Sequence, residues 1–174
     1  MIMLSWDGLE SISTETCSVS ESADGFRVES AVHGTFGQCM YTLIADDHWQ
    51  FRLLALVLGS RSLRIEFDGA VWTVDGRERQ DLEAAREVDI AISPLSNTLP
   101  IRRLELAIGE SVDITTAYVA VPALTVVADP QRYTRLADHE YRYESRDSNF
   151  ERVITVDEHG LVVTYPGLFA RSTR

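Results

Sequence analysis

The chain has 174 residues, of which 45% are hydrophobic, so it can supply the core of one domain of ordinary size. Acidic residues outnumber basic ones by 27 to 16, and the formal net charge is -11. From the length we expect a single domain over residues 1–174. Because the negative charge repels phosphate backbones and anionic membrane surfaces, we also expect that the protein does not bind nucleic acid.

The N-terminal segment lacks the features of a secretion signal, since it has no basic region and no long apolar run before acidic residues begin. The longest apolar run, residues 53–58, is far shorter than the ~20 residues that cross a bilayer. Cys17 and Cys39 have neither the spacing of a metal site nor the density of a disulfide scaffold. We therefore expect a cytoplasmic protein with reduced, buried thiols and no stable membrane insertion, and leave its oligomeric state open.

Alternating apolar and polar residues predict several β-strands in the first half. The predicted strands are residues 3–12, 26–31, 38–45 and 49–58, and residues 13–22 are predicted to form a loop or a solvated edge. Alternation is lost after Arg52, as in a strand covered on both faces, so the strand over residues 49–58 should be central.

The next segment predicts a hairpin followed by a helix. Residues 62–74 carry apolar residues on one face and turn at Asp68-Gly69, which is a strong hairpin signal. Residues 77–86 form the one convincing helix, because good helix formers run throughout and Leu82 and Ala85 fall on one side.

A stretch of unusual composition follows, over residues 88–104. It predicts an apolar strand at 88–92 joined to a second strand at 104–108 by a stiff, extended turn, because Pro94 and Pro100 disfavour the helical region for the residues before them. The polar side chains of residues 96–98 either close this turn by bonding its backbone or face a ligand, and turn chemistry favours closure.

The last third returns to β-rich sequence. Strands are predicted at residues 112–121, 124–128, 150–156 and 160–165, with Tyr141 and Tyr143 on one face of another strand and a loop over residues 129–140. The two halves show a weak internal duplication about 90 residues apart. Some ten strands against one short helix predict a mainly β fold, a large curved antiparallel sheet or half-barrel with the helix on its concave side.

Motifs of catalytic or cofactor chemistry are missing from the sequence. It has no glycine-rich phosphate loop, nucleophile elbow, zinc-protease motif or Cys-x-x-Cys pair, so we expect no cofactor and no metal. The four histidines, His33, His48, His139 and His159, lie at or beside turns and are interpreted as surface residues. A site combining Ser93, His33 and Asp89 is conceivable, but the sequence gives no geometry for it.

Aromatic and arginine residues in strands are the remaining candidates for a site. Aromatic residues of β proteins usually belong to the core. Alternatively, a curved sheet presents some of them to a cleft, where rings stack on the apolar faces of sugars or lie along acyl chains while hydroxyl and guanidinium groups bond polar heads.

The stretch over residues 88–104, with its core Asn97-Thr98-Leu99-Pro100-Ile101-Arg102-Arg103, resembles the hallmark of the bacterial putative glycolipid-binding family. Further segments agree with it across nearly the whole chain: Trp49 with Arg52, residues 131–134, residues 141–143, and residues 156–171. The resemblance implies one mostly antiparallel β domain, a curved half-barrel similar to outer-membrane lipoprotein chaperones, with a glycolipid-binding role.

Two functions are therefore considered, a non-catalytic binder of a glycolipid or similar amphiphile in the concave cleft, which we favour, and a hydrolase or isomerase acting on a small sugar-like ligand there. A structural or partner-binding β domain is a third reading. An enzyme needs an acid and a base that converge in one pocket, whereas a binder does not. The predicted ligand-binding residues are Trp49, Arg52, Trp72, Asp89, Asn97, Thr98, Arg102, Arg103, Tyr133, Tyr141, Tyr143 and Tyr165. We also expect Arg102 or Arg103 to pair with Asp89 or a neighbouring acid.

Overall fold

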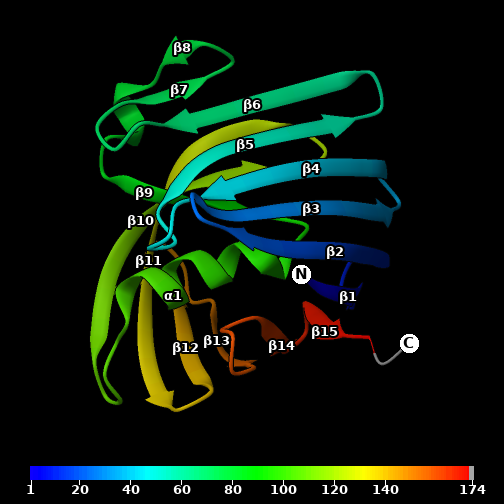
Figure 1. The fold of residues 1–174 in the computed structure, drawn as a ribbon. Helices are drawn as coiled ribbons and strands as arrows, with labels where there is room; N and C mark the ends of the chain where they lie inside the picture. The colour runs from blue at the N-terminus through cyan, green and yellow to red at the C-terminus, as the bar shows by residue number, and fades with distance from the viewer. Residues whose placement is uncertain (173–174) are drawn as a thin grey trace.

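The computed structural model describes residues 1–172 and shows one curved sheet that wraps around a helix (Figure 1). Within these residues the sheet has fifteen strands in the order β8-β7-β6-β5-β4-β3-β2-β1-β15-β14-β13-β12-β11-β10-β9. All neighbours pair antiparallel except β9 and β10, which are parallel. The fold is therefore mainly β and mostly antiparallel, as the sequence predicts.

The strands are β1 (Ile2–Gly8), β2 (Ser13–Ser22), β3 (Gly25–Gly34), β4 (Gly37–Ala45), β5 (Phe51–Leu58), β6 (Arg61–Phe67), β7 (Trp72–Val74), β8 (Arg77–Glu78), β9 (Ala85–Ile90), β10 (Ser111–Ala120), β11 (Thr125–Ala137), β12 (Glu140–Ser145), β13 (Glu151–Val156), β14 (Val162–Tyr165) and β15 (Phe169–Arg171). Two short 3₁₀ segments, η1 (Gln80–Leu82) and η2 (Pro94–Asn97), accompany the α-helix α1 (Thr98–Leu104). No helix within residues 1–172 is long and apolar enough to cross a membrane.

The two ends of the sheet approach each other. Trp72 of β7 donates a hydrogen bond from Nε1 to the carbonyl oxygen of Ala85 in β9 at 3.2 Å. Arg79, just after β8, donates to the carbonyl oxygen of Val126 in β11 at 2.9 Å. Because both edges of the sheet are joined by these contacts, the strands enclose the helix on their concave side, as Figure 1 shows.

The segment of η2 and α1 packs into the core between the two halves of the sheet. Its Leu95 and Leu99 belong to the larger apolar cluster, which joins the N-terminal strands to β9 and β10, whereas Ile101 belongs to the cluster around Tyr133 and Tyr143. The helix therefore fills the interior and joins both halves.

The position of the helix differs from the prediction. Residues 77–86, predicted to be helical, form β8, η1 and the start of β9, because Leu82 and Ala85 are fully buried and β9 pairs with β10. This long-range pairing overrides a modest helix propensity.

The prediction of an extended turn between Pro94 and Pro100 is also wrong, because these residues form η2 and the first turn of α1. Ser93 caps η2 by accepting a hydrogen bond from the backbone N–H of Leu95, and Pro94 follows at the first helical position. Pro100 lies in the first turn of α1, where its missing N–H breaks no helical hydrogen bond. The predicted strand over residues 104–108 is also absent, since α1 continues to Leu104 and Glu105 takes a left-handed φ of 47°.

Two predicted loops are strands. Residues 13–22 form β2, which pairs with β1 and β3 along its length and buries alternate residues that include the carboxylate of Glu15. Residues 129–137 continue β11, whose pairing with β10 passes through Pro130. By contrast, the predicted hairpin at Asp68-Gly69 is confirmed, with Asp68 Oδ1 accepting from the N–H groups of Ala70 and Val71.

Candidate functional site

A cavity of about 330 Å³ lies beside η2, between the end of β9 and strands β10, β12, β14 and β15. We call it the η2 cavity. Its walls combine polar side chains from β9 and η2 with aromatic side chains from the C-terminal strands, among them Asp89, Ser93, Asn97, Tyr118, Tyr143, Phe150, Tyr165 and Phe169. Four of the predicted ligand-binding residues therefore meet here, namely Asp89, Asn97, Tyr143 and Tyr165.

Asp89 is the half-buried acid of this cavity. Its Oδ1 accepts a hydrogen bond from Ser96 Oγ at 3.1 Å, and its Oδ2 accepts one from Gln131 Nε2 at 2.7 Å. Burial raises the pKa of Asp89 to about 6, although both hydrogen bonds oppose the shift. At neutral pH the carboxylate is thus charged and can accept a further hydrogen bond from a ligand hydroxyl.

A second acid lies behind Asp89. Gln131 Nε2 also donates to Asp129 Oδ2 at 2.7 Å, so one amide group bridges the two carboxylates. Burial raises the pKa of Asp129, and the hydrogen bond from Gln131 lowers it. Asp129 does not line the η2 cavity, so this bridge orients Asp89 and leaves Asp89 as the half-buried carboxylate that reaches the cavity.

Three tyrosines supply aromatic faces and free hydroxyl groups. The Tyr143 ring lies 6.1 Å from Tyr165 and 5.9 Å from Phe150 between ring centroids. Within residues 1–172, the hydroxyl groups of Tyr118, Tyr143 and Tyr165 have no hydrogen-bond partner. These groups can bond a polyhydroxylated ligand, while the rings pack on its apolar faces.

Asn97 and Tyr133 form the support beneath these groups. Asn97 Nδ2 donates to the hydroxyl oxygen of Tyr133 at 2.8 Å, and the Tyr133 ring packs edge-on against Tyr143 at 5.6 Å. Tyr133 is 1% exposed and does not line the cavity. It therefore holds Asn97 and Tyr143 in place instead of facing a ligand.

A buried acid that the sequence did not single out lies behind Ser93. Glu15 Oε1 accepts hydrogen bonds from Ser30 at 2.6 Å, Tyr41 at 2.7 Å and Ser93 at 2.9 Å. Desolvation raises the pKa of Glu15 to about 7. Sequence reasoning missed Glu15 because it predicted a loop over residues 13–22. The alternation of a strand would have placed Glu15 on the buried face.

The other predicted residues lie elsewhere. Trp72 is core, stacked on Phe51 and Phe67 at 5.3 and 4.7 Å. Arg52 pairs with Asp46 at 2.7 Å, and Thr98 is fully buried in α1. Trp49 and Arg102 line a separate cavity at the C-terminal end of α1, and Arg102 also lines a third, polar cavity together with Tyr141.

The prediction that Arg102 or Arg103 pairs with Asp89 or a neighbouring acid is confirmed by Arg103. Its guanidinium group bonds both carboxylate oxygens of Glu87, at 2.6 and 2.9 Å, and Glu87 is fully buried. The acid is thus a neighbour of Asp89, two residues away, and Arg103 is a structural clamp between α1 and β9.

No histidine joins the buried polar groups. His33 is exposed on β3 and alternates with buried Ser30 and Val32, so it lies on the outer face of the sheet, opposite Ser93. The conceivable combination of Ser93, His33 and Asp89 is therefore not assembled. Within residues 1–172, no three or more His, Cys, Asp or Glu side chains gather as a metal site.

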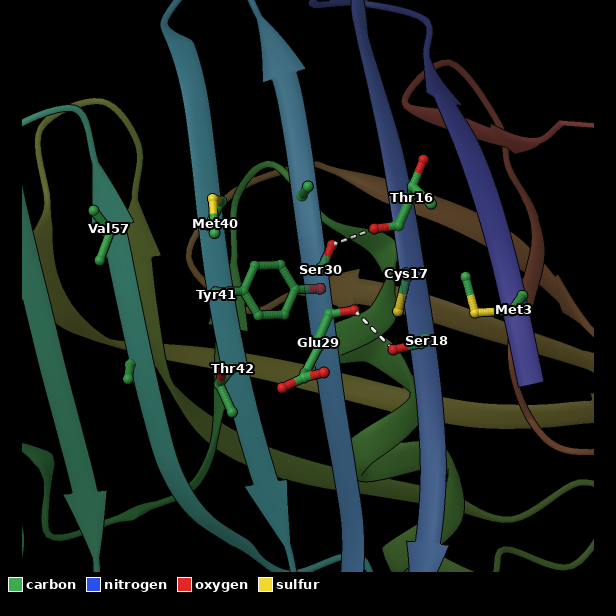
Figure 2. A pocket seen from close by; sticks show the side chains of 12 residues that line it. Met3, Thr16, Cys17, Ser18, Glu29, Ser30, Met40, Tyr41, Thr42 and Val57 are labelled. Atoms are coloured by element: carbon green, nitrogen blue, oxygen red, sulfur yellow. Dashed lines mark hydrogen bonds between the residues drawn. The ribbon is translucent and has the colours of Figure 1, made fainter. Parts of the chain in front are cut away.

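A larger depression, of about 570 Å³, lies on the outer face of the N-terminal strands. Figure 2 shows Met3, Met40 and Val57 on its strands, all of them exposed, with Ser30 bonded to the Thr16 carbonyl oxygen. It is open and mostly apolar, and its exposed acid, Glu29, pairs with Arg27 at 2.8 Å. The η2 cavity is smaller but is lined by the half-buried Asp89 and the free tyrosine hydroxyl groups, so it is the better candidate site.

Fold and cavity together define a mainly β protein whose curved sheet encloses a helix and a small cavity lined by aromatic and polar residues. The chain belongs to the family described as "Putative glycolipid-binding", whose model matches residues 3–171. It is also similar to the crystal structure of a DUF1089 family protein from Pseudomonas aeruginosa, with 34% sequence identity, a TM-score of 0.79, and coverage of 91% of this chain and 92% of that one. No curated protein matches the chain. The resemblance seen in the sequence is thereby confirmed.

Proposed function

We propose that the η2 cavity binds the uncharged sugar head group of a glycolipid or similar amphiphile without chemical change. The observation that carries this proposal is that three tyrosines with free hydroxyl groups line the same cavity as the half-buried carboxylate of Asp89. Sugars present alternating apolar faces and hydroxyl groups, which match aromatic rings and hydrogen-bonding side chains respectively.

Size and charge support a neutral head group. The volume of about 330 Å³ is at the small end of the roughly 300–1,000 Å³ of small-molecule sites. The acids Asp89 and Glu10 line the cavity and no basic side chain does, so an anionic head group would meet repulsion there.

Binding is favoured over hydrolysis by the placement of the acids. Hydrolysis of a glycosidic bond needs two carboxyl groups that flank the scissile bond. Asp89 reaches the cavity, but Asp129 stands behind Gln131, and Glu10 is exposed in a turn. Membership of a family described as glycolipid-binding points to the same function.

Calorimetric titration with octyl β-glucoside, below its micelle concentration, tests this function. The comparison ligand is an octyl oligo(ethylene glycol) ether, which has the same chain without a sugar. We expect octyl glucoside to bind saturably and more tightly than the ether. Tyr143→Phe should weaken its binding roughly three- to tenfold, because one hydrogen bond is worth about 0.5–1.5 kcal/mol.

Tyr141→Phe is the matched control, because Tyr141 lies two residues away on β12 but lines a different cavity. Its affinity for octyl glucoside should equal that of the wild type. Equal affinity for glucoside and ether, or no binding of the glucoside by a folded sample, would remove the sugar head group from the proposal. Release of free glucose during the titration would support the hydrolase instead.

A further inference from the structure

A second cavity, of about 190 Å³, lies at the C-terminal end of α1, near the start of β1 and the turn that leads into β5. We call it the Trp49 cavity. Its main walls are Ile2, Val19, Phe26, Trp49, Arg102 and Leu161. It shares no lining residue with the η2 cavity, so a ligand bound in the Trp49 cavity is independent of the proposed function.

Trp49 is held in this wall by a strained turn. Its φ is 60°, in the left-handed region that is costly for a bulky side chain. The turn is fixed by Asp46, whose Oδ1 accepts from the N–H groups of His48 and Gln50 and whose Oδ2 binds Arg52. The result is an indole ring stacked on Phe26 at 4.0 Å.

The indole nitrogen of Trp49 is unsatisfied. Trp6 Nε1 donates to the Val162 carbonyl oxygen at 2.8 Å, and Trp72 Nε1 donates to that of Ala85. Trp49 Nε1 is buried and has no acceptor in the part of the chain that the structure describes. A buried N–H without a partner costs about 1–3 kcal/mol, so a ligand that supplies an acceptor gains by satisfying it.

Arg102 provides a free cation beside this group. Its guanidinium carbon lies 5.8 Å from the centre of the Trp49 ring, and the side chain is exposed. Its neighbour Arg103 is clamped by Glu87, whereas no carboxylate of residues 1–172 lies within 4.0 Å of the Arg102 nitrogens. Arg102 also lines the polar cavity of Tyr141, whose acids include Glu105 and Glu158, and yet it pairs with none of them.

We propose that the Trp49 cavity binds a short aliphatic carboxylate. The carboxylate pairs with Arg102, which moves off the indole ring and lets one carboxylate oxygen accept a hydrogen bond from Trp49 Nε1. The alkyl chain packs against Phe26 and the aliphatic wall. One guanidinium and one N–H suit a single carboxylate, while a dianionic phosphate would need more donors. The volume, below that of drug-sized sites, restricts the chain to a few carbons.

The acidic group of the same cavity does not oppose this assignment. Glu21 is exposed at the end of β2, where water and salt screen its charge. His159 is also exposed, and its Nε2 lies 3.7 Å from Oε1 of Glu158. Arg102 is the one arginine among the residues that line the cavity, and the sequence has no lysine.

Nuclear magnetic resonance of the three indole N–H groups tests the proposal directly. The signal lost in Trp49→Phe identifies Trp49, and the signals of Trp6 and Trp72 serve as internal controls because their acceptors are fixed. Titration with hexanoate should move the Trp49 signal downfield in a saturable way and leave the other two in place. Hexan-1-ol, which has the same chain without the charge, should bind at least about tenfold more weakly.

Arg102→Gln should weaken hexanoate binding by about tenfold or more, because a charge-assisted hydrogen bond is lost. Arg77→Gln is the matched control, an exposed arginine of β8 that lines neither the η2 cavity nor the Trp49 cavity, and should bind like the wild type. Retained Trp6 and Trp72 signals show that each variant is folded. The proposal is overturned if hexanoate and hexanol bind equally, if Arg102→Gln binds hexanoate like the wild type, or if the Trp49 signal does not move at millimolar hexanoate.

Discussion

Ser93 Oγ donates a hydrogen bond to Glu15 Oε1 at 2.9 Å, although 78 positions separate the two residues in the chain. This contact joins the start of η2 to β2, on the far side of the interior. Tyr41 and Ser30 donate to the same oxygen, whereas Oε2 of Glu15 has no partner within residues 1–172. Desolvation outweighs these three hydrogen bonds and favours the protonated form of Glu15.

Glu15 should make the protein less stable as pH rises. Its pKa is about 7 in the fold against 4.5 ordinarily, so between these values the folded state holds a proton that the unfolded state has released. The contribution to stability is complete below pH 4.5 and is lost as pH rises through 7, by roughly 3 kcal/mol in all. Urea unfolding of the wild type and Glu15→Gln at pH 5 and pH 8 measures this, and an equal pH dependence in both proteins would contradict it.

Binding of octyl glucoside should weaken in acid, if Asp89 accepts a hydroxyl group of the sugar. The pKa of Asp89 is about 6, so the carboxylate is mostly charged at pH 7.5 and mostly protonated at pH 5. We expect affinity to fall several-fold over this interval, with Asp89→Asn showing no such fall. Calorimetry at both pH values gives the answer, and a pH-independent affinity in the wild type would exclude Asp89 as the acceptor.

Arg103→Ala should be strongly destabilising. It leaves the fully buried carboxylate of Glu87 without its bidentate partner, and breaking a buried pair on one side costs about 3–5 kcal/mol. The matched control is Arg27→Ala, since Arg27 and Glu29 are both about half exposed and such pairs are worth about 0–1 kcal/mol. Equal urea midpoints for the two variants would show that the pair of Arg103 with Glu87 does not clamp α1 to β9.

Trp72→Phe should lower stability without changing ligand affinity. The change removes the indole hydrogen bond to the Ala85 carbonyl oxygen, worth about 0.5–1.5 kcal/mol although Arg86 Nη1 still donates to that oxygen, and it leaves a gap between Phe51 and Phe67. Thermal unfolding and the octyl glucoside titration separate the two effects. If the folded variant binds octyl glucoside with an altered affinity, Trp72 contributes to the binding site, as the sequence predicted.

Four residues that line the η2 cavity could be predicted from the sequence. The resemblance and the polar, aromatic pattern pointed to Asp89, Asn97, Tyr143 and Tyr165, which the fold brings to one cavity. The same reasoning could not separate these from Trp72, a core residue, or from Trp49 and Arg102, which line another cavity. Rings in strands have the same composition signal whether they face the core or a cavity, and only packing distinguishes them.

The sequence by itself determined that this chain is one curved, mostly antiparallel sheet, because alternation and Asp-Gly turns are local properties that residues two or three apart impose on each other. The tertiary structure decided where the helix lies and which polar groups are buried. Residues 77–86 are good helix formers, yet pairing of β9 with β10 takes part of them into the sheet. The segment that does become helical is one whose apolar residues fill the space between the two halves of that sheet, and its cap, Ser93, finds its partner in Glu15 only after the sheet has curved. Such contacts join residues far apart in the chain, so no local pattern records them.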